Sequence, residues 1–239
     1  MSKSEIIFLS GPHSRWTELK FTMGVMMEMI KGFRALHFIG SCITIFGSAR
    51  FKENHPYYEL TRQAGAAFAR WGFTILTGGG PGLMEAANRG AQEAGGRSVG
   101  CNIQSPVEQN PNSYLDKWIY LKHFFVRKIL LVKYSFAFVV MPGGYGTLDE
   151  FFEASILIQT HTIKNFPIVI FGKQYHQELI AHVDNMKKNA TIGMDDPRLF
   201  LVTDSIEEAL AWIVEKSIKQ YGLQPENKVK PFRWLFEHK

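Results

Sequence analysis

The segment FAFVVMPGGYGTLDE, residues 136–150, decides the fold that the rest of the chain has to fit. Its first six residues are apolar and rich in aromatic and β-branched side chains, which is typical of a buried parallel strand. Pro142 ends this strand because proline has no N–H group for the ladder. The glycines of residues 143–146 allow a tight turn, with φ > 0 expected at Gly144, and let backbone N–H groups face a ligand. Thr147 is the predicted N-cap of the helix that follows.

A strand, a glycine turn and a helix N-terminus in succession form an anion-binding arrangement. The first-turn N–H groups of a helix have no partner within the helix, and the helix dipole adds partial positive charge at the same end. A phosphate group is the ligand that this arrangement favours.

Strand and helix patterns alternate from residue 42 onward. The apolar patterns predict strands at residues 42–46, 73–77, 98–103, 118–121, 136–141, 167–171 and 199–202. They predict helices at residues 56–70, 83–94, 124–134, 147–160, 175–189 and 206–219. Strands separated by helices indicate βαβ units, so the expected fold class is α/β, a parallel sheet with helices on both faces.

Glycine turns follow three of these strands, at Gly47-Ser48, residues 78–82 and residues 143–146. The carboxyl ends of parallel strands share one edge of a sheet, so the turns converge on one phosphate-bearing ligand of nucleotide size. The common nucleotide motifs do not fit. A dinucleotide fingerprint fails at Leu83, and no P-loop, zinc-ligand spacing or G-x-S-x-G elbow occurs.

The composition is that of an ordinary globular protein with a net charge of +5. Cys42 and Cys101 lie in apolar runs, which predicts buried thiols, a reducing compartment and a cytoplasmic location. No run of 18 apolar residues occurs, so no membrane partner is expected. Substrate phosphates explain a mild positive charge as well as nucleic acid does. Without a basic stripe interleaved with aromatic residues, no nucleic-acid partner is expected.

Three parts are expected along the chain: a helical extension at residues 1–40, a nucleotide-binding catalytic domain at 41–220 and a tail at 221–239. Apolar residues at helical spacing in the extension predict an amphipathic helix that covers the core or a neighbouring subunit. These residues are Trp16, Leu19, Met23, Met26, Met27 and Ile30.

Three strings together resemble the LONELY GUY (LOG) family of cytokinin riboside 5′-monophosphate phosphoribohydrolases, long mislabelled lysine decarboxylases. They are GGGPGLMEAAN at 78–88, RK at 127–128 and PGGYGTLDE at 142–150. The resemblance covers about residues 40–215 and implies a Rossmann-like doubly wound domain that forms a homodimer or a larger homo-oligomer. The first string and the N-terminal extension are similar to the longer group of the family, whose members often cleave AMP.

The resemblance implies that Arg127 and Glu150 are the catalytic pair, with no metal and no organic cofactor. It assigns substrate contacts to Glu108, Arg127, Lys128, Gly143, Gly144, Tyr145, Gly146, Thr147, Leu148 and Asp149. The glycine turns add Ser48, Gly79 and Gly80 as binding residues, and Glu85 is a candidate for a ribose contact. Ile156 and Phe125-Val126 differ from the residues usual in the family, so the base stays open between adenine and an N6-substituted adenine.

Several of these residues have a simpler interpretation. Thr147 and Glu150 also fit the capping box T-x-x-E, in which the glutamate would bond to the N-cap amide. Lys128 points about 100° away from Arg127 around a helix, so it either reaches phosphate or forms a surface ion pair. Glu85 in a first helical turn would be favourable for the helix dipole alone.

The reaction that the resemblance implies is hydrolysis of an N-glycosidic bond, which passes through an oxocarbenium-like ribose. Glu150 would stabilise that cation and take a proton from the attacking water, and Arg127 would keep Glu150 ionised. The 5′-phosphate would bind the N–H groups of residues 143–147. The products would be a free base and ribose 5-phosphate.

Three other functions fit parts of the pattern. The first is a non-catalytic nucleotide or molybdenum-cofactor carrier, since such carriers share the fold. The second is a DNA-binding Rossmann-like protein, which the mild charge argues against. The third is a true lysine decarboxylase, although nothing in the chain resembles a pyridoxal-phosphate lysine site. Release of free base from a nucleoside monophosphate distinguishes the hydrolase from all three.

Overall fold

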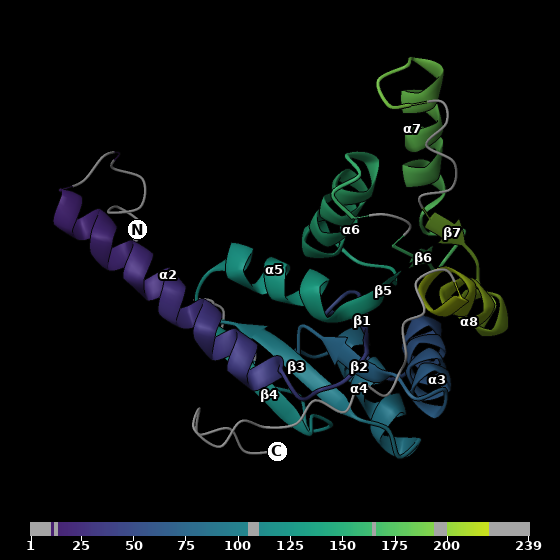
Figure 1. The fold of residues 1–239 in the computed structure, drawn as a ribbon. Helices are drawn as coiled ribbons and strands as arrows, with labels where there is room; N and C mark the ends of the chain where they lie inside the picture. Colours follow the sequence, from purple (N-terminus) through teal and green to yellow (C-terminus); the bar gives the residue numbers. More distant parts are fainter. Residues whose placement is uncertain (1–10, 12–13, 105–109, 164–165, 194–199, 220–239) are drawn as a thin grey trace.

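The computed structural model describes residues 11, 14–104, 110–163, 166–193 and 200–219. These residues form a seven-stranded sheet in the order β4-β3-β2-β1-β5-β6-β7, in which every neighbouring pair is parallel (Figure 1). In chain order the strands are β1 (Cys42–Phe46), β2 (Thr74–Thr77), β3 (Ser98–Ile103), β4 (Lys117–Leu121), β5 (Ser135–Val140), β6 (Ile168–Ile170) and β7 (Phe200–Val202). The helices are α2 (Arg15–Leu36), α3 (Pro56–Arg70), α4 (Leu83–Glu93), α5 (Phe124–Tyr134), α6 (Tyr145–Gln159), α7 (Gln177–Lys188) and α8 (Ile206–Ile213).

Two helical layers cover the sheet, which confirms the predicted α/β fold class. Side chains of β5 alternate between them, because successive residues of a strand point to opposite faces. Phe138 and Val140 join the core under α2, α5 and α6, while Ala137 and Val139 join the core under α3, α4 and α8. Cys42 and Cys101 belong to the first core and are buried free thiols, as the apolar runs predict.

The ends of most elements agree with the apolar patterns, but the start of α6 does not. The helix begins at Tyr145, and its N-cap is Gly144, which makes no side-chain cap bond. The Gly144 carbonyl accepts hydrogen bonds from the backbone N–H groups of Thr147 at 3.0 Å and Leu148 at 3.1 Å. The prediction that Thr147 is the N-cap is therefore wrong, and so is the capping box that pairs it with Glu150.

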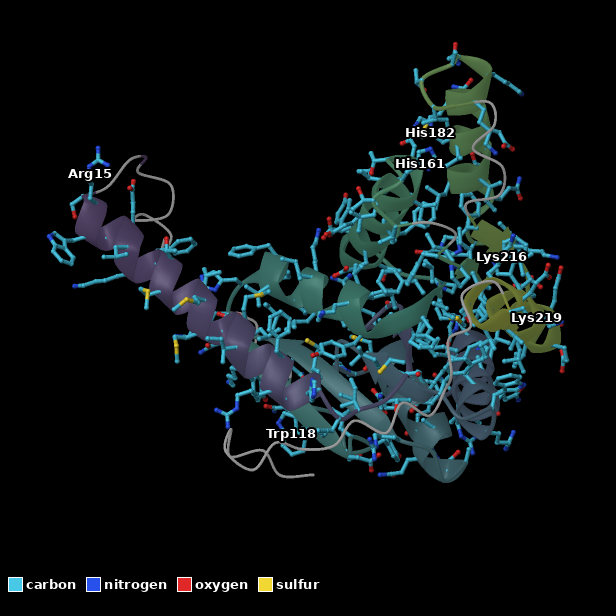
Figure 2. All side chains as sticks on the ribbon, viewed as in Figure 1. Arg15, Trp118, His161, His182, Lys216 and Lys219 are labelled. Atoms are coloured by element: carbon cyan, nitrogen blue, oxygen red, sulfur yellow. The ribbon has the colours of Figure 1, made fainter. Side chains whose placement is uncertain are left out.

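The N-terminal helix α2 differs from its expected packing. Its buried residues are Glu28, Gly32 and Leu36. The six apolar residues predicted to form its packed face are between 42% and 73% exposed, so the prediction that this face covers the core is wrong. Figure 2 shows the first half of α2, from Arg15 onward, extending away from the rest of the described structure. A neighbouring subunit as the cover for this face stays a prediction.

Another difference lies at the end of the described chain, where the predicted single helix is two. Residues 206–213 form α8, and Val214–Lys219 continues it as a π-helix. No helix in the described part of the chain combines the length and the apolar content that a membrane span requires.

Strands β1 and β5 lie side by side, but the chain leaves them toward opposite halves of the sheet. After β1 the order runs outward to β2, β3 and β4, and after β5 it runs outward to β6 and β7. Such a switch point opens a crevice beyond the strand ends, where ligands bind in this class of fold. Hydrogen bonds tie the turns there together: Ser48 N donates to Pro142 O at 3.0 Å, and Leu83 N donates to Ser48 O at 2.9 Å.

Candidate active site

A cavity of about 560 Å³ lies at this switch point. The loop after β1 lines it with residues 46–50, and the loop after β5 lines it with residues 143–147. The other lining residues are Gly78, Met84, Ile103, Arg127, Leu131 and Tyr175. The cavity therefore joins a glycine turn at a helix N-terminus to a cation and to several apolar side chains.

The glycine turn of residues 143–146 is open toward the cavity. A Cβ atom on Gly144 or Gly146 would meet no atom within 4 Å, whereas a Cβ on Gly143 would collide with the Thr147 side chain. Gly144 has φ −97°, so the expected positive φ at this residue is wrong. The tyrosine hydroxyl of Tyr175 donates to Gly143 O at 2.9 Å and braces the turn.

The other glycine turn, residues 78–82, is closed by the protein itself. Gly79 has φ +73° and packs against the Asn102 amide, and Gly82 has φ +71° and packs against the backbone at Ser48. Asn112 Nδ2 donates to Gly79 O at 3.3 Å and to Gly80 O at 3.0 Å. Gly79 and Gly80 are buried and do not line the cavity, unlike Gly78. Their predicted role in binding stays a prediction.

Arg127 on α5 and Glu150 on α6 face each other beside the cavity. Arg127 Nη2 lies 3.4 Å from Glu150 Oε1, which is a long contact for an ion pair with hydrogen bonding. Arg127 lines the cavity, and Glu150, only 1% exposed, lies behind the lining one helical turn after Thr147. Neither Glu150 Oε2 nor Arg127 Nε has a hydrogen-bond partner among the described residues.

Burial dominates the ionisation of Glu150. It raises the pKa of the carboxyl from 4.5 to about 7, although the nearby charges of Arg127 and Lys128 act in the opposite direction. Burial therefore outweighs the effect expected of Arg127, which is to keep Glu150 ionised. A carboxyl with a pKa near neutrality can both accept and return a proton at physiological pH, which suits general acid–base chemistry.

Lys128 and Asp149 are held in a surface cluster. Lys128 Nζ lies 2.9 Å from Asp149 Oδ1 and 2.7 Å from Glu153 Oε2. Partial burial disfavours the charged amine, but these two carboxylates raise the pKa of Lys128. The surface ion pair is thus the arrangement that forms, and neither Lys128, Asp149 nor Leu148 lines the cavity.

The other predicted site residues differ in whether they line the cavity. Ser48 lines the cavity, and its Oγ accepts a hydrogen bond from Arg50 N at 3.1 Å. Glu85 does not line it, and its Oε1 accepts a hydrogen bond from the Tyr58 hydroxyl at 3.0 Å. Glu108 lies outside the described residues, so its role is untested.

The sequence patterns missed several lining residues. Arg50 is the most informative, because it is a cation that lines the same cavity as the open glycine turn. The sequence does contain a signal for Arg50. It stands three residues after Gly47, the glycine that follows the predicted strand at residues 42–46, at the edge of the sheet where the ligand is expected. Phe46, Met84, Ile103 and Leu131 give the cavity an apolar wall that suits a planar base. No local signal marks Tyr175. Among the described residues, no cluster of acidic, histidine and cysteine side chains could hold a metal ion.

The family model described as "possible lysine decarboxylase" matches residues 84–213, more than half of the chain. The chain belongs to this family. The matched span contains Arg127, Glu150 and the open glycine turn, and the curated relatives identify the family with the LOG proteins that the sequence resembles.

Two relatives are named cytokinin riboside 5′-monophosphate phosphoribohydrolase. The protein from Rhodococcoides fascians is 28% identical over 72% of this chain and 88% of its own length. The protein from Mycobacterium tuberculosis is 31% identical over 64% of this chain and 82% of its own. A pyrimidine/purine nucleotide 5′-monophosphate nucleosidase from Escherichia coli is 23% identical over 72% of this chain and 42% of its own.

Solved structures share the fold. A molybdenum-cofactor carrier protein from Chlamydomonas reinhardtii superposes with a TM-score of 0.55 at 22% identity, covering 75% of this chain and 99% of the carrier. A molybdenum-cofactor binding protein from Rippkaea orientalis has a TM-score of 0.53 at 22% identity, over 73% and 94% of the two chains. These likenesses concern the Rossmann-like fold alone.

Proposed function

We propose that this LOG-family protein is a phosphoribohydrolase that cleaves the N-glycosidic bond of adenosine 5′-monophosphate or an N6-substituted form of it. The products are the free base and ribose 5-phosphate. The observation that carries the proposal is the Arg127–Glu150 pair beside a cavity with an open glycine turn. The names of the relatives support the reaction class.

The 5′-phosphate binds at the open turn. The N-terminal N–H groups of α6 and the positive end of its dipole attract the anion, and Arg50, which lines the same cavity, supplies a full positive charge. Gly144 and Gly146 leave the space that a phosphate needs, since neither carries a side chain toward it. This remote binding energy orients the ribose for reaction.

Glu150 acts on the ribose. In its ionised form it stabilises the positive charge that develops at the anomeric carbon, and it accepts a proton from the attacking water. Its pKa of about 7 leaves a large ionised fraction at neutral pH and lets it release that proton afterwards, and the departing base takes up one proton so that it leaves as the neutral free base. The long 3.4 Å contact with Arg127 tightens when substrate is bound, as catalytic hydrogen bonds commonly do.

The test is a comparison of AMP, N6-isopentenyl-AMP and the matching nucleosides, followed by detection of free base and ribose 5-phosphate. We expect free base and ribose 5-phosphate from one or both of the monophosphates. The matching nucleosides should be cleaved at least about 10²-fold more slowly, because a phosphate anchor contributes to the transition state. Equal cleavage of adenosine and AMP would contradict a phosphate site at the glycine turn.

A carrier function is the second candidate, favoured by the position of Glu150 behind the cavity wall and by the fold shared with cofactor carriers. A carrier would bind a phosphate-bearing ligand without releasing a base. Binding of AMP with no product after prolonged incubation with excess enzyme would favour this function over the hydrolase.

A further inference from the structure

Helix α5 carries Arg127 but has no cap of its own. Its N-cap residue, His123, makes no side-chain capping bond, and the first turn contains no acidic residue. Arg127 stands directly over this end, with its backbone N–H donating to His123 O at 3.2 Å. The position of the first turn of α5 therefore determines the backbone position from which the Arg127 side chain projects.

Helix α2 supplies the missing acceptor from a distant part of the chain. Oε1 of Glu28 accepts the backbone N–H groups of Lys122 at 2.7 Å and of His123 at 3.1 Å, although His123 is 95 residues away. Oε2 of the same carboxylate lies 2.7 Å from His123 Nδ1. A carboxylate at a helix N-terminus satisfies free N–H groups and is favourable for the dipole.

Glu28 is built into this contact rather than resting on the surface. The residue is only 9% exposed, and charged residues are rarely so buried without partners. Burial disfavours its ionised form, but the hydrogen bonds from His123 and Lys122 prevail and lower the pKa of the carboxyl. Glu28 is therefore a carboxylate at neutral pH.

Neighbouring contacts fix the two helices against each other. The ring of Phe21 on α2 lies 5.3 Å from the ring of His123 at the start of α5. One turn of α2 after Glu28, a Cβ atom on Gly32 would collide with the Leu130 side chain, so the helices approach closely there. Two turns of α5 are thus held against α2, on both sides of Arg127.

We propose that Glu28 is a positioning residue for Arg127: it caps α5 from the N-terminal helix and so sets the Arg127–Glu150 geometry. The inference rests on the proposed function. With this role for Glu28, the second half of α2 helps to position a catalytic residue. The sequence patterns, in contrast, predict that this helix belongs to an extension outside the catalytic domain.

The experiment compares Glu28→Ala and Glu28→Gln with Glu18→Gln, a control that removes an exposed carboxylate from the same helix. With AMP as substrate, we expect kcat of Glu28→Ala to fall about tenfold with KM within about threefold, because misplacement of a catalytic group mainly affects the transition state. Glu28→Gln keeps an acceptor oxygen and should lose less. Glu18→Gln should match the parent protein.

A double-variant cycle separates positioning from a general loss of structure. In a protein that already carries Arg127→Ala, Glu28→Ala should reduce kcat by less than about twofold, since residues acting through one group are not additive. The same tenfold loss in both backgrounds would overturn the proposal. So would an unchanged kcat in a folded Glu28→Ala or, if that variant does not fold, in Glu28→Gln.

Hydrogen exchange gives a readout independent of catalysis. In Glu28→Ala, or in Glu28→Gln if only that variant folds, the amides of residues 122 and 123 should lose protection, while those of the α3–α4 layer should not. If the parent protein cleaves no monophosphate, the proposed function fails while the cap is still confirmed by this loss. Unchanged protection at both amides would overturn the cap itself.

Discussion

The two glycine turns at the strand ends look alike in sequence and differ in what they need glycine for. In residues 78–82, Gly79 and Gly82 have positive φ, and any Cβ there would collide with neighbouring protein atoms. In residues 143–146, Gly144 has negative φ, and a Cβ on it would meet nothing within 4 Å. The first turn requires glycine for folding, whereas the second has no such internal reason at Gly144.

This difference indicates which turn serves a ligand. A glycine that neither the backbone nor the packing requires, on the wall of a cavity, leaves room for something outside the chain. Each turn also precedes a helix with a glutamate near its start, Glu85 on α4 and Glu150 on α6. Glu85 is engaged by the Tyr58 hydroxyl, while one oxygen of Glu150 has no partner among the described residues.

The largest expected effect belongs to the closed turn. Gly82→Ala places a methyl group 2.5 Å from Ser48 O and forces an L-residue into φ +71°. The left-handed conformation costs about 1–2 kcal/mol and overpacking about 1–3 kcal/mol, so we expect a loss of about 2–5 kcal/mol in the free energy of unfolding. Chemical denaturation measures it. A loss under about 1 kcal/mol would remove the distinction between the turns.

The next effect is the pH dependence of stability that Glu150 introduces beside the open turn. Its pKa is about 7 in the folded protein, against 4.5 when unfolded. Between these values the folded state holds the proton more tightly, so the stability contributed by the neutral carboxyl is complete below about pH 4.5 and disappears as pH rises through 7. At 1.36 kcal/mol per pKa unit, the change is about 3 kcal/mol.

The measurement is the free energy of unfolding of the parent protein and of Glu150→Gln from pH 4.5 to 8. The amide cannot ionise, so the free energy of unfolding of the variant should rise relative to that of the parent as pH increases over this range. Glu85→Gln removes a carboxylate from the helix after the closed turn and is the matched control. A constant difference between Glu150→Gln and the parent would show that burial does not raise the pKa of Glu150.

The third effect is catalytic. Glu150→Gln keeps the size of the side chain but removes the charge that opposes the oxocarbenium ion, so turnover of AMP should fall by at least about 10²-fold, or roughly 2.7 kcal/mol. KM should change little, because the charge matters mainly in the transition state. Glu85→Gln should stay within about threefold of the parent. Normal turnover in Glu150→Gln would end its catalytic assignment.

Much of the fold follows from local patterns in the sequence. The ends of β1, α3, β3 and α5 agree with their predicted residues, since apolar runs bounded by glycine, proline and polar residues mark them. The start of α6 was missed because its N-cap, Gly144, has no side chain that marks a cap, whereas Thr147, two residues inside the helix, carries the more familiar signal.

The parts of the site that could not be predicted depend on contacts between distant segments. Arg50 lines the same cavity as the open turn because β1 and β5 are adjacent in the sheet. Glu28 meets His123 across 95 residues, and nothing in its local sequence distinguishes it from a solvent-exposed glutamate. The raised pKa of Glu150 likewise follows from tertiary burial, which the T-L-D-E string does not encode.

The smallest expected effect is at Gly144, and it tests the open turn directly. Gly144→Val adds a side chain at φ −97°, an ordinary conformation for valine, into a space with no protein atom within 4 Å. The free energy of unfolding should therefore change by less than about 1 kcal/mol. If phosphate binds at this turn, the isopropyl group occupies its approach, and KM for AMP should rise at least about tenfold, or about 1.4 kcal/mol.

The control for this variant is Gly24→Ala on α2, where an added Cβ also meets no atom within 4 Å, and KM should stay unchanged. Gly95→Val cannot serve as the control because Gly95 has φ +74°. A folded Gly144→Val with the KM of the parent would mean that the bare surface of this turn is not where the substrate binds.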